Sequence, residues 1–190
     1  MLTFATALLT HAPFLESLEP FVAEVAAAGE RSALAQLLLK LTVPGVPDVY
    51  QGDELIDLSL VDPDNRRPVD WETRRVALDE LRGGAKPTRA TMKLHVISRA
   101  LGLRARRRGV FGVGGAYTAL AAGPDVCAFT RGDDEVLVAV VLRGPPAGVE
   151  LDVPAGHYRD VLTGEAHEFA GRVGIRALVD AHGLALLERV

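Results

Sequence analysis

The stretch 44-PGVPDVYQGDEL-55 decides how the first half of this 190-residue chain is interpreted. Its short apolar core ends in Gln-Gly-Asp-Glu, so polar side chains gather where the apolar segment stops. A helical pattern comes before it. A helix that leads into a short buried strand, with polar residues at the strand's C-terminal edge, is typical of α/β proteins. We therefore predict a buried strand over 46–51, with Tyr50 in the core.

Apolar residues recur at three- and four-residue spacing on both sides of this stretch. Before it, we expect one helix that Pro13 opens and Gly29 ends, and a second helix over about 30–42. The second helix has a leucine-rich face and little polar surface elsewhere, which indicates burial on more than one side. After the stretch, we expect helices over 72–82 and 89–107.

The pattern changes after Gly109. Short segments rich in Val, Leu, Phe and Tyr alternate with turn residues, which is typical of an antiparallel sheet or sandwich. We therefore predict two domains, 1–112 and 113–190. The expected strands of the second domain are 116–122, 126–131, 135–142, 149–153, 157–162, 165–169, 175–179 and 184–190.

Composition excludes several classes of protein. A net charge of −4 argues against a general nucleic-acid binder, and we interpret the basic run 104-RARRRG-109 as the solvated end of a helix. Cys127 is the only cysteine, so no internal disulfide can form, which fits a reducing compartment. The five histidines lack metal-ligand spacing, so we expect no metal and no cofactor.

Targeting signals are also absent from the pattern. No Lys or Arg precedes the apolar stretch at the N-terminus, so we do not expect a signal peptide. No run of about eighteen apolar residues occurs, so we expect no membrane span. A cytoplasmic location is the resulting expectation.

The second informative stretch is 58-LSLVDPDNRRPVDW-71, in which an apolar segment is followed by five charged residues, two prolines and a tryptophan. Asp62 and Arg66 are four residues apart around Pro63, so a tight turn can aim both at one pair of hydroxyl groups. Carboxylates accept hydrogen bonds from sugar hydroxyls and guanidinium groups donate to them. A hydrogen-bonded surface turn without a ligand is the alternative.

The order of these elements resembles the C-terminal end of the α-amylase-type glycoside hydrolases, where a (β/α)8 barrel precedes a small antiparallel β domain. The stretch 44–55 resembles the eighth barrel strand, 62-DPDNR-66 the loop after it, and 89–107 the eighth helix. The stretch 159-RDVLTGE-165 resembles a hairpin of the β domain. The resemblance implies an α+β fold: the last strand and flanking helices of a (β/α)8 barrel, followed by an antiparallel β-sandwich.

The continuous run from VPDVYQGDEL to VDPDNRRPVDW, together with the ending GLALLERV, resembles the trehalose-forming glucosylmutases of this superfamily. They convert the reducing-end α-1,4 linkage of maltooligosaccharides to an α,α-1,1 linkage. Ile56 is a departure, because an aromatic residue is expected there.

The resemblance implies a retaining mechanism, in which two carboxyl groups lie about 5–5.5 Å apart. In the family these groups, with a third carboxylate, come from the ends of the fourth, fifth and seventh strands, before the part that is recognised here. The acidic residues before Pro44 lie on helical patterns and are interpreted as surface charges; they are Glu16, Glu19, Glu24 and Glu30. We therefore expect no catalytic residue and no activity of this chain alone.

Substrate binding is the role left for this chain, because the active sites of such barrels lie in the loops after the strands. By resemblance, Asp62 and Arg66 bind the donor-side sugar, and Asn65, Arg67 and Asp64 brace the loop. Gln51 and Asp53 begin the loop. For Asp53 and Glu54 a site role and a structural salt bridge stay equally open. Trp71 either stacks on a sugar or packs.

A lone barrel strand has two unpaired edges, and helix 30–42 should expose a face. We expect a missing N-terminal barrel portion or a homodimer partner to cover this surface. The expected ligand is a maltooligosaccharide; nucleic acid and membrane are not expected partners. The alternative function is a stand-alone carbohydrate-binding or scaffolding domain without catalysis.

Overall fold

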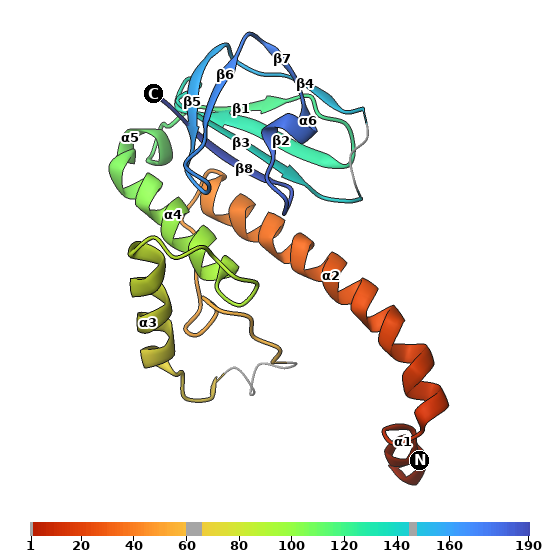
Figure 1. Cartoon of the computed structure of the whole chain (residues 1–190). Coiled ribbons are helices and arrows are strands. Elements are labelled where there is room, and N and C mark those ends of the chain that lie inside the picture. The colour runs from red at the N-terminus through yellow and green to blue at the C-terminus, as the bar shows by residue number, and fades with distance from the viewer. Residues whose placement is uncertain (1, 60–65, 145–147) are drawn as a thin grey trace.

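The computed structural model describes residues 2–59, 66–144 and 148–190. An all-β part lies on a set of helices, and one long helix projects away from both (Figure 1). In chain order the elements are α1 (Leu2–Leu8), α2 (Ala12–Thr42), α3 (Trp71–Arg82), α4 (Met92–Arg106), α5 (Arg108–Phe111), β1 (Tyr117–Leu120), β2 (Val126–Arg131), β3 (Val136–Val141), β4 (Glu150–Asp152), β5 (Gly156–Asp160), β6 (Ala166–Phe169), β7 (Arg172–Gly174), α6 (Ile175–Leu178) and β8 (Leu184–Arg189).

Helix α2 is one continuous helix of 31 residues, so the expectation of two helices that meet at Gly29 is wrong. His11 caps it, since its Nδ1 atom accepts a hydrogen bond from the backbone amide of Phe14 at 3.3 Å. A glycine inside a helix costs only about 1 kcal/mol relative to alanine, which packing of the buried C-terminal half of the helix offsets. Pro20 is likewise accommodated inside α2.

The all-β part consists of a six-stranded sheet in the order β1-β2-β3-β8-β5-β6 and a two-stranded sheet of β4 and β7. The strands pair in antiparallel fashion, and Val138 of β3 lies between Phe129 of β2 and Leu186 of β8. An antiparallel sheet was expected from the punctuated strand pattern, and the structure confirms it.

The central strands β2, β3 and β8 are buried on both faces of the six-stranded sheet, and their side chains alternate between the two faces. Val136, Val138 and Val140 of β3 face the helices, where they join a core with leucines of α2 and α4. Leu137 and Ala139 face the other way and pack under the small sheet and α6. The helices and the sheet thus share a core, and the boundary between 112 and 113 stays a prediction.

Arg131, at the end of β2, is only 1% exposed and joins the sheet to the helices. Its guanidinium donates three hydrogen bonds to backbone carbonyls: to Ala116 at 3.0 Å, to Thr42 at 3.1 Å and to Val110 at 3.0 Å. Thr42 ends α2, so this buried cation satisfies a carbonyl that the helix itself leaves unpaired.

The strand expected over 46–51 does not form. Residues 46–50 have no regular secondary structure, and a turn begins at residue 51. Tyr50 was expected in the core, but its side chain is 49% exposed. A strand needs a neighbour that satisfies its backbone groups, and the described residues place none beside this segment.

Two further expectations are corrected. Residues 175–178 form α6 rather than a strand, because Ile175 and Leu178, three residues apart, are both buried on one side of a single turn. The basic run at 104–109 is not merely solvated. Arg104 donates to the carbonyls of Leu41 at 3.0 Å and Gly45 at 2.9 Å, and Arg106 and Arg107 both pair with Glu188.

Candidate functional site

The loop after α2 makes a tight turn at Gly52. Gly52 has a φ of +85°, and a Cβ atom there would lie 3.1 Å from Val69. The amide of Asp53 donates to the carbonyl of Tyr50 at 3.0 Å, which closes the turn. Leu55 packs against the small cluster that α3 and α4 form. The turn therefore requires a residue that tolerates the left-handed region and leaves room for Val69.

Arg74 of α3 holds both ends of the loop. Its Nη2 atom donates to the carbonyl of Gly52 at 2.6 Å, and its Nε atom to the carboxylate of Glu54 at 3.2 Å. Its Nη1 atom donates to the carbonyl of Asp70 at 3.0 Å. One guanidinium thus ties the residues before 60–65 to the residue that caps α3 after them.

Lys93 of α4 provides a second attachment. Its ammonium group forms an ion pair with Asp53 and donates to the carbonyl of Leu55 at 3.3 Å. The carboxylates of both Asp53 and Glu54 are therefore engaged in ion pairs that hold the loop. This arrangement fits the structural interpretation that the sequence left open, and a sugar-binding role of Asp53 stays a prediction.

The remaining site residues from the sequence are only partly described. Asp62, Asp64 and Asn65 lie outside the described residues. Gln51, Arg66 and Arg67 have exposed side chains, and both arginines have interaction partners within the molecule. The structure thus places Gln51 and Asp53 in one braced turn, while the proposed sugar contacts of Asp62 and Arg66 remain predictions.

Asp57 is a loop residue that the sequence reasoning passed over. Its carboxylate accepts hydrogen bonds from the hydroxyl of Ser59 at 2.6 Å and from the amide of Ser59 at 2.9 Å. These bonds, with the nearby charges of Lys93 and Arg67, hold the pKa of Asp57 below 3.8 despite some desolvation. The Asp-Leu-Ser sequence is a signal for such a turn and could have identified it.

Trp71 begins α3, at the far end of the stretch. The carboxylate of Asp70 caps this helix by accepting from the amide of Thr73 at 3.0 Å and from its hydroxyl at 2.6 Å. These bonds lower the pKa of Asp70 below 3.8. The Trp71 side chain is 54% exposed, so the indole is accessible to a ring that stacks on it.

A hollow of about 610 Å³ lies beside this loop, between it, α2 and the start of α4. Ile56, Asp57 and Leu58 form one wall, and Leu34 and Met92 contribute apolar surface from the two helices. Glu30 pairs with Arg89 across it, and the other charged side chains of the lining are Arg31, Asp57 and Lys93.

Two properties of the described residues bear on the class of site. No group of three or more His, Cys, Asp and Glu side chains in this part of the chain could hold a metal ion. Within the same residues, no helix combines the length and apolarity that crossing a membrane requires.

Comparison with known proteins agrees with this fold. Residues 118–185 match the family model of the alpha amylase C-terminal all-beta domain. Over 167 residues, 83% of this chain, the sequence is 48% identical to a putative maltooligosyl trehalose synthase of Mycobacterium tuberculosis strain CDC 1551. The chain thus resembles one portion of the maltooligosyl trehalose synthases. It spans about a fifth of the length of the curated relatives that it matches, since it covers 20% of that protein.

Solved structures of maltooligosyl trehalose synthases have the same fold over almost the whole chain. The S44P mutant of the Arthrobacter ramosus enzyme is 36% identical, covers 97% of this chain with a TM-score of 0.84, and is matched over 25% of its own length. A second maltooligosyl trehalose synthase is 27% identical, with a TM-score of 0.79 over 95% of this chain. The projecting α2 is therefore part of the shared fold.

Proposed function

We propose that this chain is the C-terminal part of a (1→4)-α-D-glucan 1-α-D-glucosylmutase, which converts the reducing-end α-1,4 linkage of maltooligosaccharides to α,α-1,1. The observation that carries the proposal is the 48% identity to a putative maltooligosyl trehalose synthase over 83% of the chain. The agreement in fold with the Arthrobacter ramosus enzyme supports it. A cytoplasmic location stays a prediction.

The role of this chain is to bind substrate and to complete the fold, while the catalytic carboxylates come from the rest of the polypeptide. The pairing of Asp53 with Lys93 and of Glu54 with Arg74 supports this division. A retaining mechanism needs one free carboxylate as the nucleophile and one carboxylic acid as the proton donor. A carboxylate that a fixed cation keeps ionised does not suit the task of proton donor.

The substrate-binding part rests on how the loop is held. Arg74 and Lys93 fix the turn at Gly52 and Asp53, and Asp70 fixes the start of α3. In the sequence, Asp62 and Arg66 lie between these two attachments. Sites on braced loops bind more tightly because less conformational freedom is lost when a ligand binds. The exposed ring of Trp71 supplies a stacking surface at the far end.

The test is an assay with maltopentaose. The purified chain is incubated alone, and also together with the part of the Arthrobacter ramosus synthase that lies outside the match. We expect trehalose-ended product only in the mixture. Product from this chain alone would show that it carries its own catalytic groups.

Calorimetric titration with maltopentaose tests the binding role separately. Arg66→Ala should weaken binding by about tenfold or more, as expected when a charge-assisted hydrogen bond to a ligand is lost. Arg159→Ala is the matched control, because Arg159 is also an exposed arginine but lies on β5. Binding that is unchanged in Arg66→Ala would reject this residue as a sugar contact. Binding to the isolated chain with no product from the mixture would favour the stand-alone carbohydrate-binding domain.

A further inference from the structure

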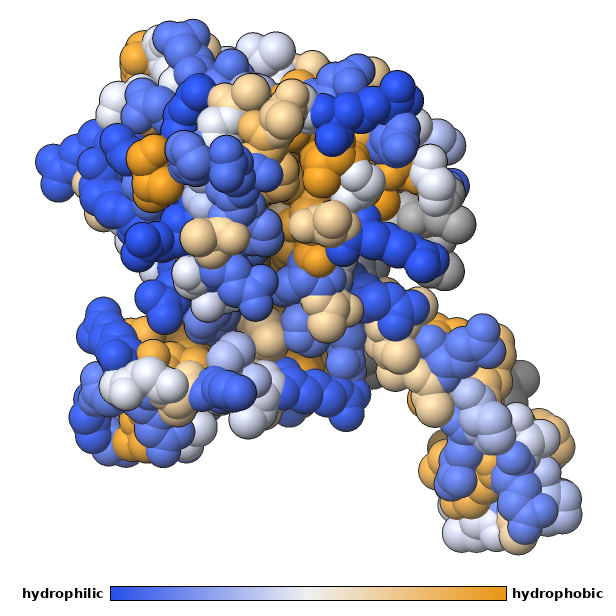
Figure 2. All heavy atoms as spheres, turned by 45° about the horizontal axis from the view of Figure 1, so that its top comes forward, coloured by the Kyte–Doolittle hydropathy of each residue, from blue (hydrophilic) through white to orange (hydrophobic). Residues whose placement is uncertain are grey.

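The N-terminal half of α2 is an apolar arm without a partner in the described part of the chain. Phe21 is 63% exposed, and Val22 and Val25 are exposed beside it, whereas burial begins only at Leu34. Figure 2 shows this arm standing clear of the body, with orange surface along it. A helix that is apolar on several sides is normally buried. The composition of the arm is therefore typical of a helix that packs against other polypeptide.

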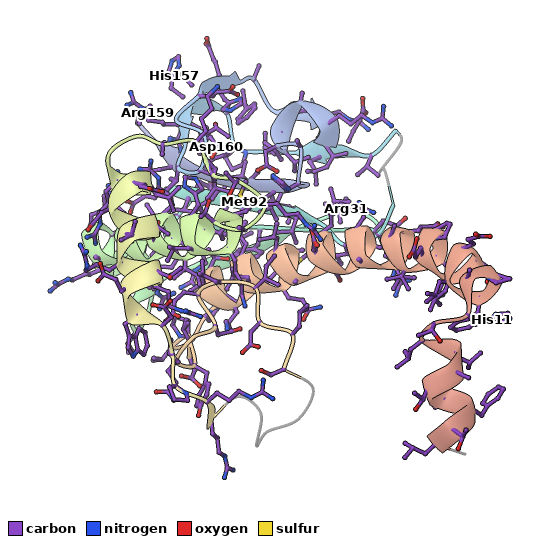
Figure 3. All side chains as sticks on the ribbon, turned by 60° about the horizontal axis from the view of Figure 1, so that its bottom comes forward. His11, Arg31, Met92, His157, Arg159 and Asp160 are labelled. Carbon is purple, nitrogen blue, oxygen red and sulfur yellow. The ribbon has the colours of Figure 1, made fainter. Side chains whose placement is uncertain are left out.

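A second hollow, of about 830 Å³, lies at the base of this arm on the side of the sheet. Val25, Ala28 and Ser32 of α2 form one wall. Val141 and Leu142 at the end of β3 form another, and the segment 179–183 closes the hollow. Figure 3 shows Arg31 on the side of α2 that faces the β strands.

Three guanidinium groups line this basic hollow, and each comes from a different element. Arg31 lies on α2, Arg143 follows β3, and Arg176 lies on α6. Among the described residues none of the three has an ion-pair partner, although nine other ion pairs are present. Asp180 also lines the hollow, but its Oδ1 atom already accepts from the amides of His182 and Leu184, at 2.8 Å and 2.9 Å.

The two hollows beside α2 therefore differ in charge. On the loop side, Glu30 pairs with Arg89 and Asp53 pairs with Lys93. Arg31 lines this hollow too, but the carboxylate of Asp57 offsets its charge there, so the charges balance. On the sheet side, Arg31, Arg143 and Arg176 leave an excess of positive charge in a chain whose net charge is −4. A concave surface with one sign of charge and apolar walls favours an occupant that carries the opposite charge.

We propose that the basic hollow docks a carboxylate-bearing segment of the polypeptide that makes up the rest of the full-length synthases, and that the apolar arm packs on the same polypeptide. The proposal rests on the proposed function, because it takes its occupant from the longer relatives. In the Arthrobacter ramosus enzyme the same fold, with a TM-score of 0.84, occupies only 25% of the chain. That enzyme therefore has polypeptide available to cover α2.

The test measures binding of this chain to the part of the Arthrobacter ramosus synthase outside the match, by copurification after co-expression and then by titration. The test variant reverses all three charges: Arg31→Glu, Arg143→Glu and Arg176→Glu. The control variant reverses three exposed arginines elsewhere: Arg82→Glu, Arg108→Glu and Arg159→Glu. Thermal unfolding of each variant alone checks that the fold is intact. A second variant, Phe21→Ser with Val25→Ser, tests the arm.

We expect the test variant to bind at least about tenfold more weakly and with a smaller dependence on salt, while the control variant binds like the unaltered chain. Equal loss in both variants, or no loss in the test variant, would overturn the docking site. Self-association of this chain that the same three substitutions abolish, without binding to the other polypeptide, would also overturn it in favour of a dimer. Arginine-dependent binding without trehalose-ended product would leave the docking site standing and reject the proposed function.

Discussion

Arg131 of β2 donates a hydrogen bond to the carbonyl of Thr42, the last residue of α2, over a distance of 3.1 Å. The two residues are 89 positions apart in the chain, and both are almost completely buried. The same guanidinium also binds the carbonyls of Ala116 and Val110. The helical and β parts thus meet at a buried cation that is satisfied by carbonyl oxygens.

Replacing Arg131 with alanine should therefore destabilise the whole chain. Three carbonyls lose a charged donor in a buried place, and a cavity replaces the side chain, so the free energy of unfolding should fall by about 3 kcal/mol. Urea unfolding followed by circular dichroism measures it. Arg159→Ala, on an exposed face of β5, should change it by less than about 0.5 kcal/mol. Equal effects of the two substitutions would contradict the role of Arg131.

Arg74→Ala should loosen the loop at Gly52 more than it destabilises the chain. Its three hydrogen bonds join Gly52, Glu54 and Asp70, so we expect a loss of about 1–2 kcal/mol and faster amide exchange at Asp53. Arg75→Ala, one position along the same helix, is the control. Arg75 is exposed and pairs only along α3, so its loss should have little effect. Unchanged exchange at Asp53 would mean that Arg74 does not hold the loop.

His95 should make stability depend on pH. Burial is the main cause that lowers its pKa below 6.5, and the charge of Arg99 acts in the same direction. The hydrogen bond to the carbonyl of Leu162, at 2.9 Å, and the charge of Asp180 act in the opposite direction but do not prevail. The unfolded chain therefore takes up this proton at a higher pH than the folded chain does. The stability that the neutral ring contributes is complete above about pH 6.5 and is lost as the pH falls through the folded pKa.

Unfolding of the wild type and of His95→Gln, each measured from about pH 8 to pH 5, tests this dependence. The wild type should lose more stability on acidification than the variant does. His157→Gln, an exposed histidine on β5, should follow the wild type. Parallel curves for the wild type and His95→Gln would show that another group is responsible.

Gly115→Ala should destabilise the chain by about 2 kcal/mol, because backbone would have to move. A Cβ atom at this position would lie 2.1 Å from the carbonyl oxygen of Val110. Gly109→Ala is the matched control, since a Cβ atom there meets nothing within 4 Å and the residue lies inside α5. Alanine favours helix, so the control should be neutral or stabilising by up to about 1 kcal/mol. Similar thermal shifts for the two variants would contradict the close approach at Gly115.

Sequence patterns predicted most of the β part, because its strands alternate and its turns contain glycine and proline. The family assignment also followed from the run around 46–71. The exception was α6, where the spacing of Ile175 and Leu178 fits a helical turn as well as a strand. The prediction of a strand over 46–51 was wrong for another reason. A buried strand needs a neighbouring strand on each side, and the described chain provides neither.

The hydrogen bonds of Arg131 and the ion pairs of Arg74 and Lys93 could not be predicted from the spacing of residues in the sequence. Each of these interactions joins residues at least 20 positions apart in the chain. The residues next to each cation in the sequence do not reveal its partner. The prediction that Gly29 ends a helix was wrong for a physical reason. A glycine often ends a helix by turning to the left-handed region, but Gly29 keeps the helical conformation and α2 continues through it.

The continuity of α2 across Gly29 has a mechanical consequence. At 1.5 Å per residue its 31 residues form a rod about 46 Å long, clamped at one end by the Thr42 contact. Force applied near Phe21 would act on the strands through a lever, since α2 continues as one helix from there to Thr42. Anchoring the protein at Ser17 would therefore set the orientation of the sheet relative to the anchor.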